Sequence, residues 1–104
     1  MIELNDKTWI DFISKNEKVL VDVYGDGCGP CQKMEPILMD LESHSSLDVA
    51  FGKINGMNNI EAVAKYGVGS VPTLLYFKSG KLMCKQSGLK NLQEIQNSIQ
   101  THLL

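Results

Sequence analysis

The sequence predicts an α/β fold in which helices cover both faces of one mixed β-sheet of four to five strands. Short β-branched apolar runs alternate along the chain with stretches whose apolar residues recur every three or four positions. The last two apolar runs are separated only by Ser79 and Gly80, which indicates an antiparallel hairpin. The length of 104 residues gives room for one domain, spanning residues 1–104.

The N-terminal half is expected to form two strands and two helices. Residues 19–24 read Val-Leu-Val-Asp-Val-Tyr, which is typical of a buried strand, and a glycine follows them. Ahead of this run we expect a short edge strand at residues 2–4 and a helix capped by Asn5 or Asp6. A helix over residues 31–43 is predicted by apolar residues on one helical face, namely Met34, Ile37, Leu38 and Leu41.

The C-terminal half is expected to add a strand, a short helix, the hairpin and a last helix. A strand is predicted over residues 47–54 and a helix over residues 60–66. The strands of residues 19–24 and 47–54 should be parallel because a helix joins them through a right-handed crossover. The hairpin comprises residues 73–77 and 81–86. The last helix has one apolar side, made of Leu92, Ile95, Ile99 and Leu103.

Composition argues against several classes of function. Ten basic and twelve acidic residues give a net charge of −2, which offers no electrostatic reason to bind nucleic acid or an anionic membrane. No run approaches the roughly 18 apolar residues of a membrane span. The N-terminus lacks the basic start and apolar stretch of a secretory signal, so we expect a cytoplasmic protein with no nucleic-acid or membrane partner. Three cysteines in a reducing compartment point to reactivity rather than to structural disulfides.

The segment Cys28-Gly29-Pro30-Cys31 carries the chemistry. It lies where a predicted strand gives way to a predicted helix, and proline suits a first helical turn. Cys28 is therefore expected at the helix N-terminus, where free N–H groups and the helix dipole favour a thiolate. Cys31, one turn further on, can attack a mixed disulfide formed at Cys28. The pair is expected to shuttle between a dithiol and a Cys28–Cys31 disulfide.

Half of a zinc site is the alternative interpretation of the two cysteines. A structural zinc ion takes four ligands, and the remaining candidates are Cys84, His44 and His102, which form no second ligand pair. We therefore expect no metal. We assign no role to either histidine, and Cys84 is expected to pack in the interior, with a reactive exposed thiol as the alternative.

Several segments resemble the thioredoxin family in order and spacing. They are Val21-Asp22-Val23-Tyr24 followed by Cys28-Gly29-Pro30-Cys31, then Pro36, Lys53, Val71-Pro72-Thr73, Phe77-Lys78-Ser79-Gly80 and Gly88. The resemblance spans nearly the whole chain and implies the thioredoxin fold. It also implies a monomeric protein-disulfide reductase and electron carrier that needs no bound cofactor. Such a protein acts on oxidised protein substrates and is recycled by a thioredoxin reductase.

A buried acid and a lysine accompany the cysteines. Asp22 interrupts an apolar strand, and burial should raise the pKa of its carboxyl and make it a candidate proton acceptor. The resemblance implies that Asp22 assists deprotonation of Cys31, whereas the alternative is a hydrogen-bonded or solvated strand residue. Lys53 matches a family lysine that can pair with this acid. A surface lysine that keeps its charge in water is the alternative for Lys53.

A surface for protein substrates is the second implication of the resemblance. It implies that the Val71–Pro72 peptide bond is cis and packs over the cysteines, with the Val71 backbone available to an extended substrate segment. A simple turn proline is the alternative, as is a simple turn for Gly88. The positions expected to form a flat, weakly polar surface around Cys28 are Gly29, Pro30, Val71, Pro72 and Gly88.

Four departures from the family pattern surround this surface. Gly27 stands where the family usually has a tryptophan, Tyr24 replaces a second tryptophan, and Gln32 replaces a lysine. Gly56 and Met57 occupy a stretch where an acidic residue is expected. With Gly27, the substrate-binding surface loses aromatic contact area beside the nucleophile. We therefore expect a specialised thioredoxin with an unusual partner.

Two other functions fit the same sequence. The first is a binding module, in which the fold acts as a structural or redox-gated subunit for one dedicated partner protein. The second is a disulfide oxidant or isomerase, which would be expected in an oxidising compartment and usually has other residues between its cysteines. The Gly29-Pro30 pair favours the reductase.

Overall fold

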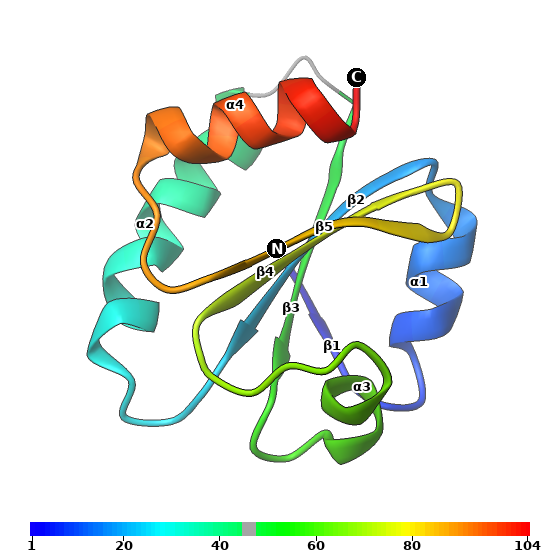
Figure 1. Cartoon of the computed structure of the whole chain (residues 1–104), viewed down its shortest axis with the longest axis vertical. Coiled ribbons are helices and arrows are strands. Elements are labelled where there is room, and N and C mark those ends of the chain that lie inside the picture. The colour runs from blue at the N-terminus through cyan, green and yellow to red at the C-terminus, as the bar shows by residue number, and fades with distance from the viewer. Residues whose placement is uncertain (45–47) are drawn as a thin grey trace.

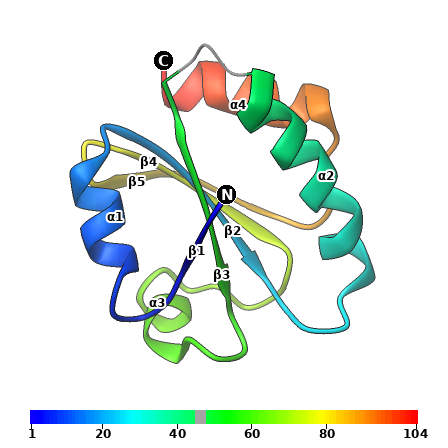
Figure 2. The same cartoon turned by 180° about the vertical axis from the view of Figure 1, so that it is seen from behind.

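The computed structural model describes residues 1–44 and 48–104. Its elements form one five-stranded sheet with two helices on each face (Figures 1 and 2). In chain order they are β1 (Ile2–Leu4), α1 (Trp9–Lys15), β2 (Lys18–Tyr24), α2 (Gly29–His44), β3 (Ala50–Asn55), α3 (Ile60–Lys65), β4 (Thr73–Lys78), β5 (Lys81–Ser87) and α4 (Leu92–His102). The element order and the α/β fold class predicted from the sequence are confirmed.

The sheet is mixed, as predicted. Its strand order is β1-β3-β2-β4-β5, so β2 lies at the centre. β2 pairs in parallel with β3, and β3 in parallel with β1. On its other side β2 pairs antiparallel with β4, which forms the hairpin with β5. The central strand therefore runs directly into the cysteine segment that follows it.

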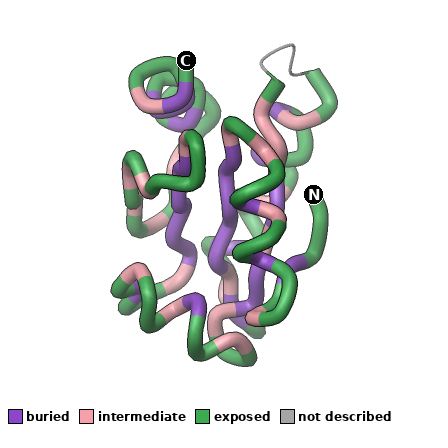
Figure 3. The backbone as a smooth tube through the Cα atoms, turned by 90° about the vertical axis from the view of Figure 1, so that its right-hand side faces the viewer, coloured by how far each residue is buried: buried purple, intermediate pink, exposed green. Residues whose placement is uncertain are grey.

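Two apolar cores fill the space between the sheet and its helices. Side chains alternate between the faces of a strand, so Val19, Val21 and Val23 of β2 pack on the side of α1 and α3. Leu20 packs on the opposite side with residues of α2 and α4. Buried residues are accordingly concentrated in the strands, between more exposed helices (Figure 3). Asp22 lies two residues after Leu20 in β2, so its side chain is on the same face of the sheet, toward α2.

Neither Asn5 nor Asp6 is the N-cap residue of α1, although Asn5 caps the turn that leads into this helix: its Oδ1 accepts the N–H of Lys7 at 2.8 Å and its carbonyl accepts the N–H of Trp9 at 3.0 Å. Thr8 occupies the N-cap position of α1 and makes no side-chain capping hydrogen bond. The Asp6 carboxylate instead accepts the backbone N–H groups of Glu61 at 3.2 Å and Ala62 at 2.9 Å. Asp6 therefore caps α3, a helix that lies more than fifty residues further along the chain.

Some boundaries differ from those predicted. α2 begins at Gly29 rather than at residue 31, because proline is accommodated in a first helical turn, where its missing N–H has no partner to lose. The strand expected over residues 47–54 runs from Ala50 to Asn55, and Leu47 lies outside the described residues. No helix in the described part of the chain is long and apolar enough to cross a membrane.

Candidate active site

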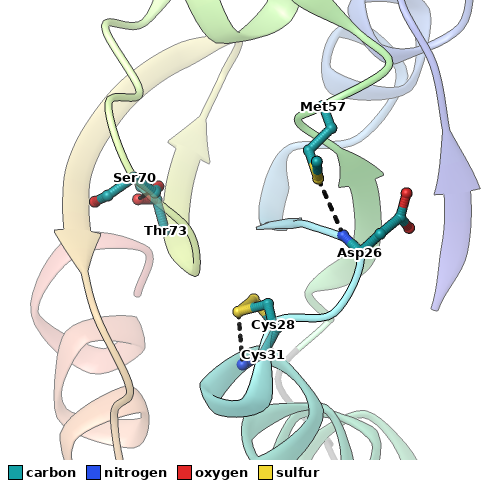
Figure 4. Close-up of a disulfide and its surroundings, with 6 residues drawn as sticks. All are labelled: Asp26, Cys28, Cys31, Met57, Ser70 and Thr73. Atoms are coloured by element: carbon teal, nitrogen blue, oxygen red, sulfur yellow. Dashed lines mark hydrogen bonds between the residues drawn. A yellow bond between two sulfur atoms is a disulfide. The ribbon is translucent and has the colours of Figure 1, made fainter.

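Cys28 and Cys31 form a disulfide at the N-terminus of α2, with their Cα atoms 5.3 Å apart. Cys28 is the residue before the helix, and its carbonyl accepts the N–H of Gln32 at 3.1 Å. The Sγ of Cys28 accepts the N–H of Cys31 at 3.2 Å (Figure 4). In the reduced protein the same N–H and the helix dipole would stabilise a Cys28 thiolate.

The two cysteines differ in accessibility. Cys28 is half-buried, whereas Cys31 is only 4% exposed. Gly29 and Pro30 between them are exposed, and Gly27 before them has a φ of 65°, in the region that favours glycine. An incoming disulfide therefore meets Cys28 first, and Cys31 is reached from inside the protein.

Asp22 is the buried acid of the site. It is 2% exposed, and its Oδ1 atom has no hydrogen-bond partner within residues 1–44 and 48–104. Burial, with the negative charge of Glu35 next in size, raises the pKa of Asp22 from 3.8 to about 7, although Lys53 opposes the rise. The carboxyl can therefore take up or release a proton near neutral pH, and the rise in its pKa predicted from burial is confirmed.

A cavity of about 240 Å³ connects Asp22 with the inner cysteine. Cys31 and Asp22 both line it, and its volume is large enough for water molecules to relay a proton between them. The remaining lining residues are Tyr24, Gly25, Asp26, Gly27, Gln32, Glu35 and Lys53.

Lys53 contacts a different acid from the one expected. Its Nζ lies 2.7 Å from Oε1 of Glu35 in α2, and the family pairing with Asp22 is not formed as an ion pair. The hydrogen bond to Glu35 raises the pKa of Lys53. The Nζ also lies 5.6 Å from the centroid of the Tyr24 ring.

Sequence reasoning missed Glu35. A signal for it exists, because Glu35 follows Cys31 by four residues and therefore lies on the same face of the helix. That face of α2 lines the cavity, where Glu35 forms an ion pair with Lys53 of β3.

The turn before β4 contains the residues around Pro72 that are expected at the substrate surface. The Val71–Pro72 bond is cis, and the carbonyl of Pro72 accepts the N–H of Gly88 at 2.8 Å. Gly88 has a φ of 92°, which requires glycine at this turn. A methyl group added to Gly25 would lie 3.1 Å from Cγ2 of Val71, so the turn before β4 packs against the loop before Cys28.

Two residues that depart from the family pattern, Met57 and Tyr24, lie next to the loop before Cys28. The backbone N–H of Asp26 donates to Sδ of Met57 at 3.2 Å (Figure 4), and Met57 is 61% exposed. The Tyr24 hydroxyl donates to the Glu3 carboxylate at 2.9 Å, and burial together with Glu3 raises the pKa of Tyr24 to about 12. An exposed thioether therefore contacts the loop before Cys28, in a stretch where the resemblance implies a carboxylate.

The third cysteine and the histidines lie outside this constellation. Cys84 in β5 is partly buried against the α2 and α4 core, as expected, and burial raises the pKa of its thiol. His44 contacts Asp40 one turn earlier in α2. Within the described residues, no three His, Cys, Asp or Glu side chains are grouped to hold a metal ion.

Thiol-disulfide oxidoreductases work through a pair of cysteines of this kind, in which a partly exposed cysteine reacts with the substrate and a buried one re-forms the disulfide. The Thioredoxin family model matches residues 1–101. Thioredoxin of Chlamydia pneumoniae is 34% identical over 98% of this chain and 99% of its own length. Thioredoxin of Chlamydia caviae is 38% identical over 81% of each chain. A solved structure, a single-residue mutant of thioredoxin from Halobacterium salinarum NRC-1, superposes with a TM-score of 0.89 at 33% identity, covering 99% of this chain and 90% of its own.

The chain therefore belongs to the thioredoxin family. The family and fold predicted from the resemblance are confirmed, and the protein is a disulfide reductase that works through a Cys28–Cys31 couple.

Proposed function

We propose that Cys28 is the attacking thiolate, that Cys31 resolves the intermediate and that Asp22 accepts the proton of Cys31. The observation that carries this assignment is the joint lining of one cavity by Asp22 and the buried Cys31, below the more accessible Cys28. No bound cofactor or metal is needed, because the two sulfur atoms carry both electrons.

The reaction has two exchange steps. The Cys28 thiolate attacks one sulfur of a protein disulfide, so that the substrate bond breaks, one substrate thiolate leaves and a mixed disulfide forms. Asp22 then takes the proton of the Cys31 thiol, directly or through water, and the Cys31 thiolate attacks Sγ of Cys28. The second substrate sulfur leaves as a thiolate, which takes up a proton from water or from Asp22; two electrons have then reached the substrate, and the Cys28–Cys31 disulfide remains.

The neighbouring residues position the substrate. Gly29 and Pro30 keep the thiol side of the helix uncovered, and Pro72 holds the turn that packs against the Cys28 loop. We assign substrate contact to Val71, through its backbone N–H and C=O, and to Gly88 and Gly27, whose lack of a side chain allows an extended segment to approach.

A thioredoxin reductase is the proposed electron donor, and oxidised proteins are the proposed substrates. We place the protein in the cytoplasm as a monomer, since a reducing compartment keeps such a couple supplied with electrons. Size-exclusion chromatography with light scattering tests the monomer, and a dimer would contradict it.

Trapping the intermediate tests the assignment of the cysteines. In a Cys84→Ser background, which removes the third thiol, Cys31→Ser should accumulate a mixed disulfide with insulin that mass spectrometry detects. Cys28→Ser should form none and should not release insulin thiols. A Cys28→Ser protein that still reduced insulin would overturn the assignment.

The reduction potential separates a reductant from an oxidant or isomerase. Equilibration with dithiothreitol and glutathione buffers should give a reduction potential of about −270 mV. A value of about −120 to −180 mV would instead indicate an oxidant or isomerase. Failure of the couple to cycle would indicate a binding module for a dedicated partner.

A further inference from the structure

Lys53 faces three carboxylates on the α2 side of the sheet. In the strand register Glu3 pairs with Lys53 and Lys53 pairs with Asp22, so these three side chains lie in one row on one face. Glu35 reaches the same lysine from α2. The lysine therefore stands among three acids, and its position decides which of them is neutralised.

The ammonium is committed to Glu35. The distance from Nζ of Lys53 to Oε1 of Glu35 is 2.7 Å, while Oδ1 of Asp22 has no hydrogen-bond partner among the described residues. The two paired side chains are partly screened from water, with exposed fractions of 26% for Lys53 and 39% for Glu35. Asp22, which is far more deeply buried, makes no ion pair within the described part of the chain.

The other described groups around Asp22 do not neutralise its negative charge either. Tyr24 follows Asp22 on β2, but its hydroxyl donates its hydrogen bond to Glu3. Asp26, in the loop after β2, lines the same cavity as Asp22. On the opposite side β4 places the apolar Leu74 in register with Asp22. α2 contributes the Cys31 sulfur and Glu35. The proton affinity of the Asp22 carboxyl therefore depends on whether the positive charge of Lys53 is neutralised by Glu35 or acts on Asp22.

We propose that Glu35 is a positioning residue for the resolving step, which holds the Lys53 ammonium away from Asp22 and so keeps the Asp22 carboxyl able to take the proton of Cys31. The inference rests on the proposed function of Asp22 as that proton acceptor. A carboxylate paired with an ammonium binds a proton weakly, and a general base works best when its proton affinity matches the working pH. The repulsion that Glu35 exerts on the Asp22 charge acts in the same direction.

Removing the charge of Glu35 gives the first test. Carbon-13 NMR should follow the side-chain carboxyl of Asp22 through a pH titration of the oxidised protein, a measurement that needs no substrate. In Glu35→Gln the titration midpoint should fall by about one pH unit. Glu35→Asp, which keeps the charge, should restore it. Asp40→Asn, which removes an exposed carboxylate from the same helix, should leave the midpoint unchanged.

A double-mutant cycle tests whether Glu35 acts through the lysine. Lys53→Gln alone should raise the midpoint of Asp22, because the cation that lowers it is lost. In the Lys53→Gln background, Glu35→Gln should shift the midpoint less than it does in the parent protein. Equal shifts in both backgrounds would overturn the positioning role and leave direct repulsion alone.

The single-turnover rate of insulin reduction, measured against pH, connects the charge arrangement to the reaction. In Glu35→Gln the rising limb of the profile for the resolving step should move to lower pH together with the Asp22 midpoint. An unchanged Asp22 midpoint in Glu35→Gln would overturn the inference about Glu35. A midpoint that moves while the rate profile stays fixed would overturn the proposed role of Asp22 instead.

Discussion

Replacement of Asp22 by asparagine should remove a large dependence of stability on pH. The folded protein holds this carboxyl with a pKa of about 7, against an ordinary value of 3.8 in the unfolded chain. Below the lower value both states are protonated and the acid contributes no pH-dependent difference. Between about pH 4 and pH 7 the unfolded chain releases the proton first, so the free energy of unfolding falls as pH rises.

The size of the effect follows from the two values. Their difference corresponds to about 4 kcal/mol of lost stability, all of it present above pH 7 and none of it below pH 3.8. Asp22→Asn keeps the shape of the side chain but has no charge to bury. The variant should therefore be about as stable as the parent at about pH 4 and up to about 4 kcal/mol more stable at about pH 8.

Urea unfolding of the oxidised proteins across this pH range is the appropriate assay, because each midpoint converts to a free energy of unfolding. Asp26→Asn serves as the control, since it removes an exposed acid that lines the same cavity and should leave the trend of the parent protein unchanged. A difference between parent and Asp22→Asn that is the same at acidic and alkaline pH would refute the reasoning.

Three other substitutions test the fold and the substrate surface. Asp6→Ala should cost about 1 kcal/mol of stability in urea, because α3 loses its cap, and an unchanged midpoint would contradict that role. Leu38→Ala should cost about 2–5 kcal/mol in the same assay, since the side chain is fully buried between α2 and the sheet; a loss below this range would mean that the core closes around the gap. Gly25→Ala should raise KM for insulin but not for a small aromatic disulfide, because the added methyl group presses on Val71; equal effects on both substrates would argue against a docking role.

The strands and the reactive cysteines could be predicted because their signals are local. The β-branched run around Asp22 contains one acid among apolar residues, so both the strand and its unusual carboxyl are visible in six consecutive letters. Cys28 and Cys31 stand where that strand pattern changes to a helical one, which fixes them at a helix N-terminus.

The contacts that tune the site could not be predicted, because they join segments that only the folded arrangement brings together. Asp6 caps a helix that begins more than fifty residues later, and no spacing rule reaches that far. The ion pair of Lys53 with Glu35 depends on how α2 crosses the sheet above β3. The resemblance to thioredoxins supplied the lysine with Asp22 as its partner, whereas the structure pairs Lys53 with Glu35.

The central position of β2 gives the backbone around Asp22 more protection from solvent than the backbone next to Cys28. Its backbone amides are bonded to β3 on one side and to β4 on the other, so they exchange with solvent deuterium only when the sheet itself opens. The exposed turn of Asp26 and Gly27 that continues the strand has no such protection from neighbouring strands. The Asp22 carboxyl, the proposed proton acceptor, is thus anchored in a strand whose amides are paired on both sides, whereas Cys28 follows a turn that lies outside the sheet.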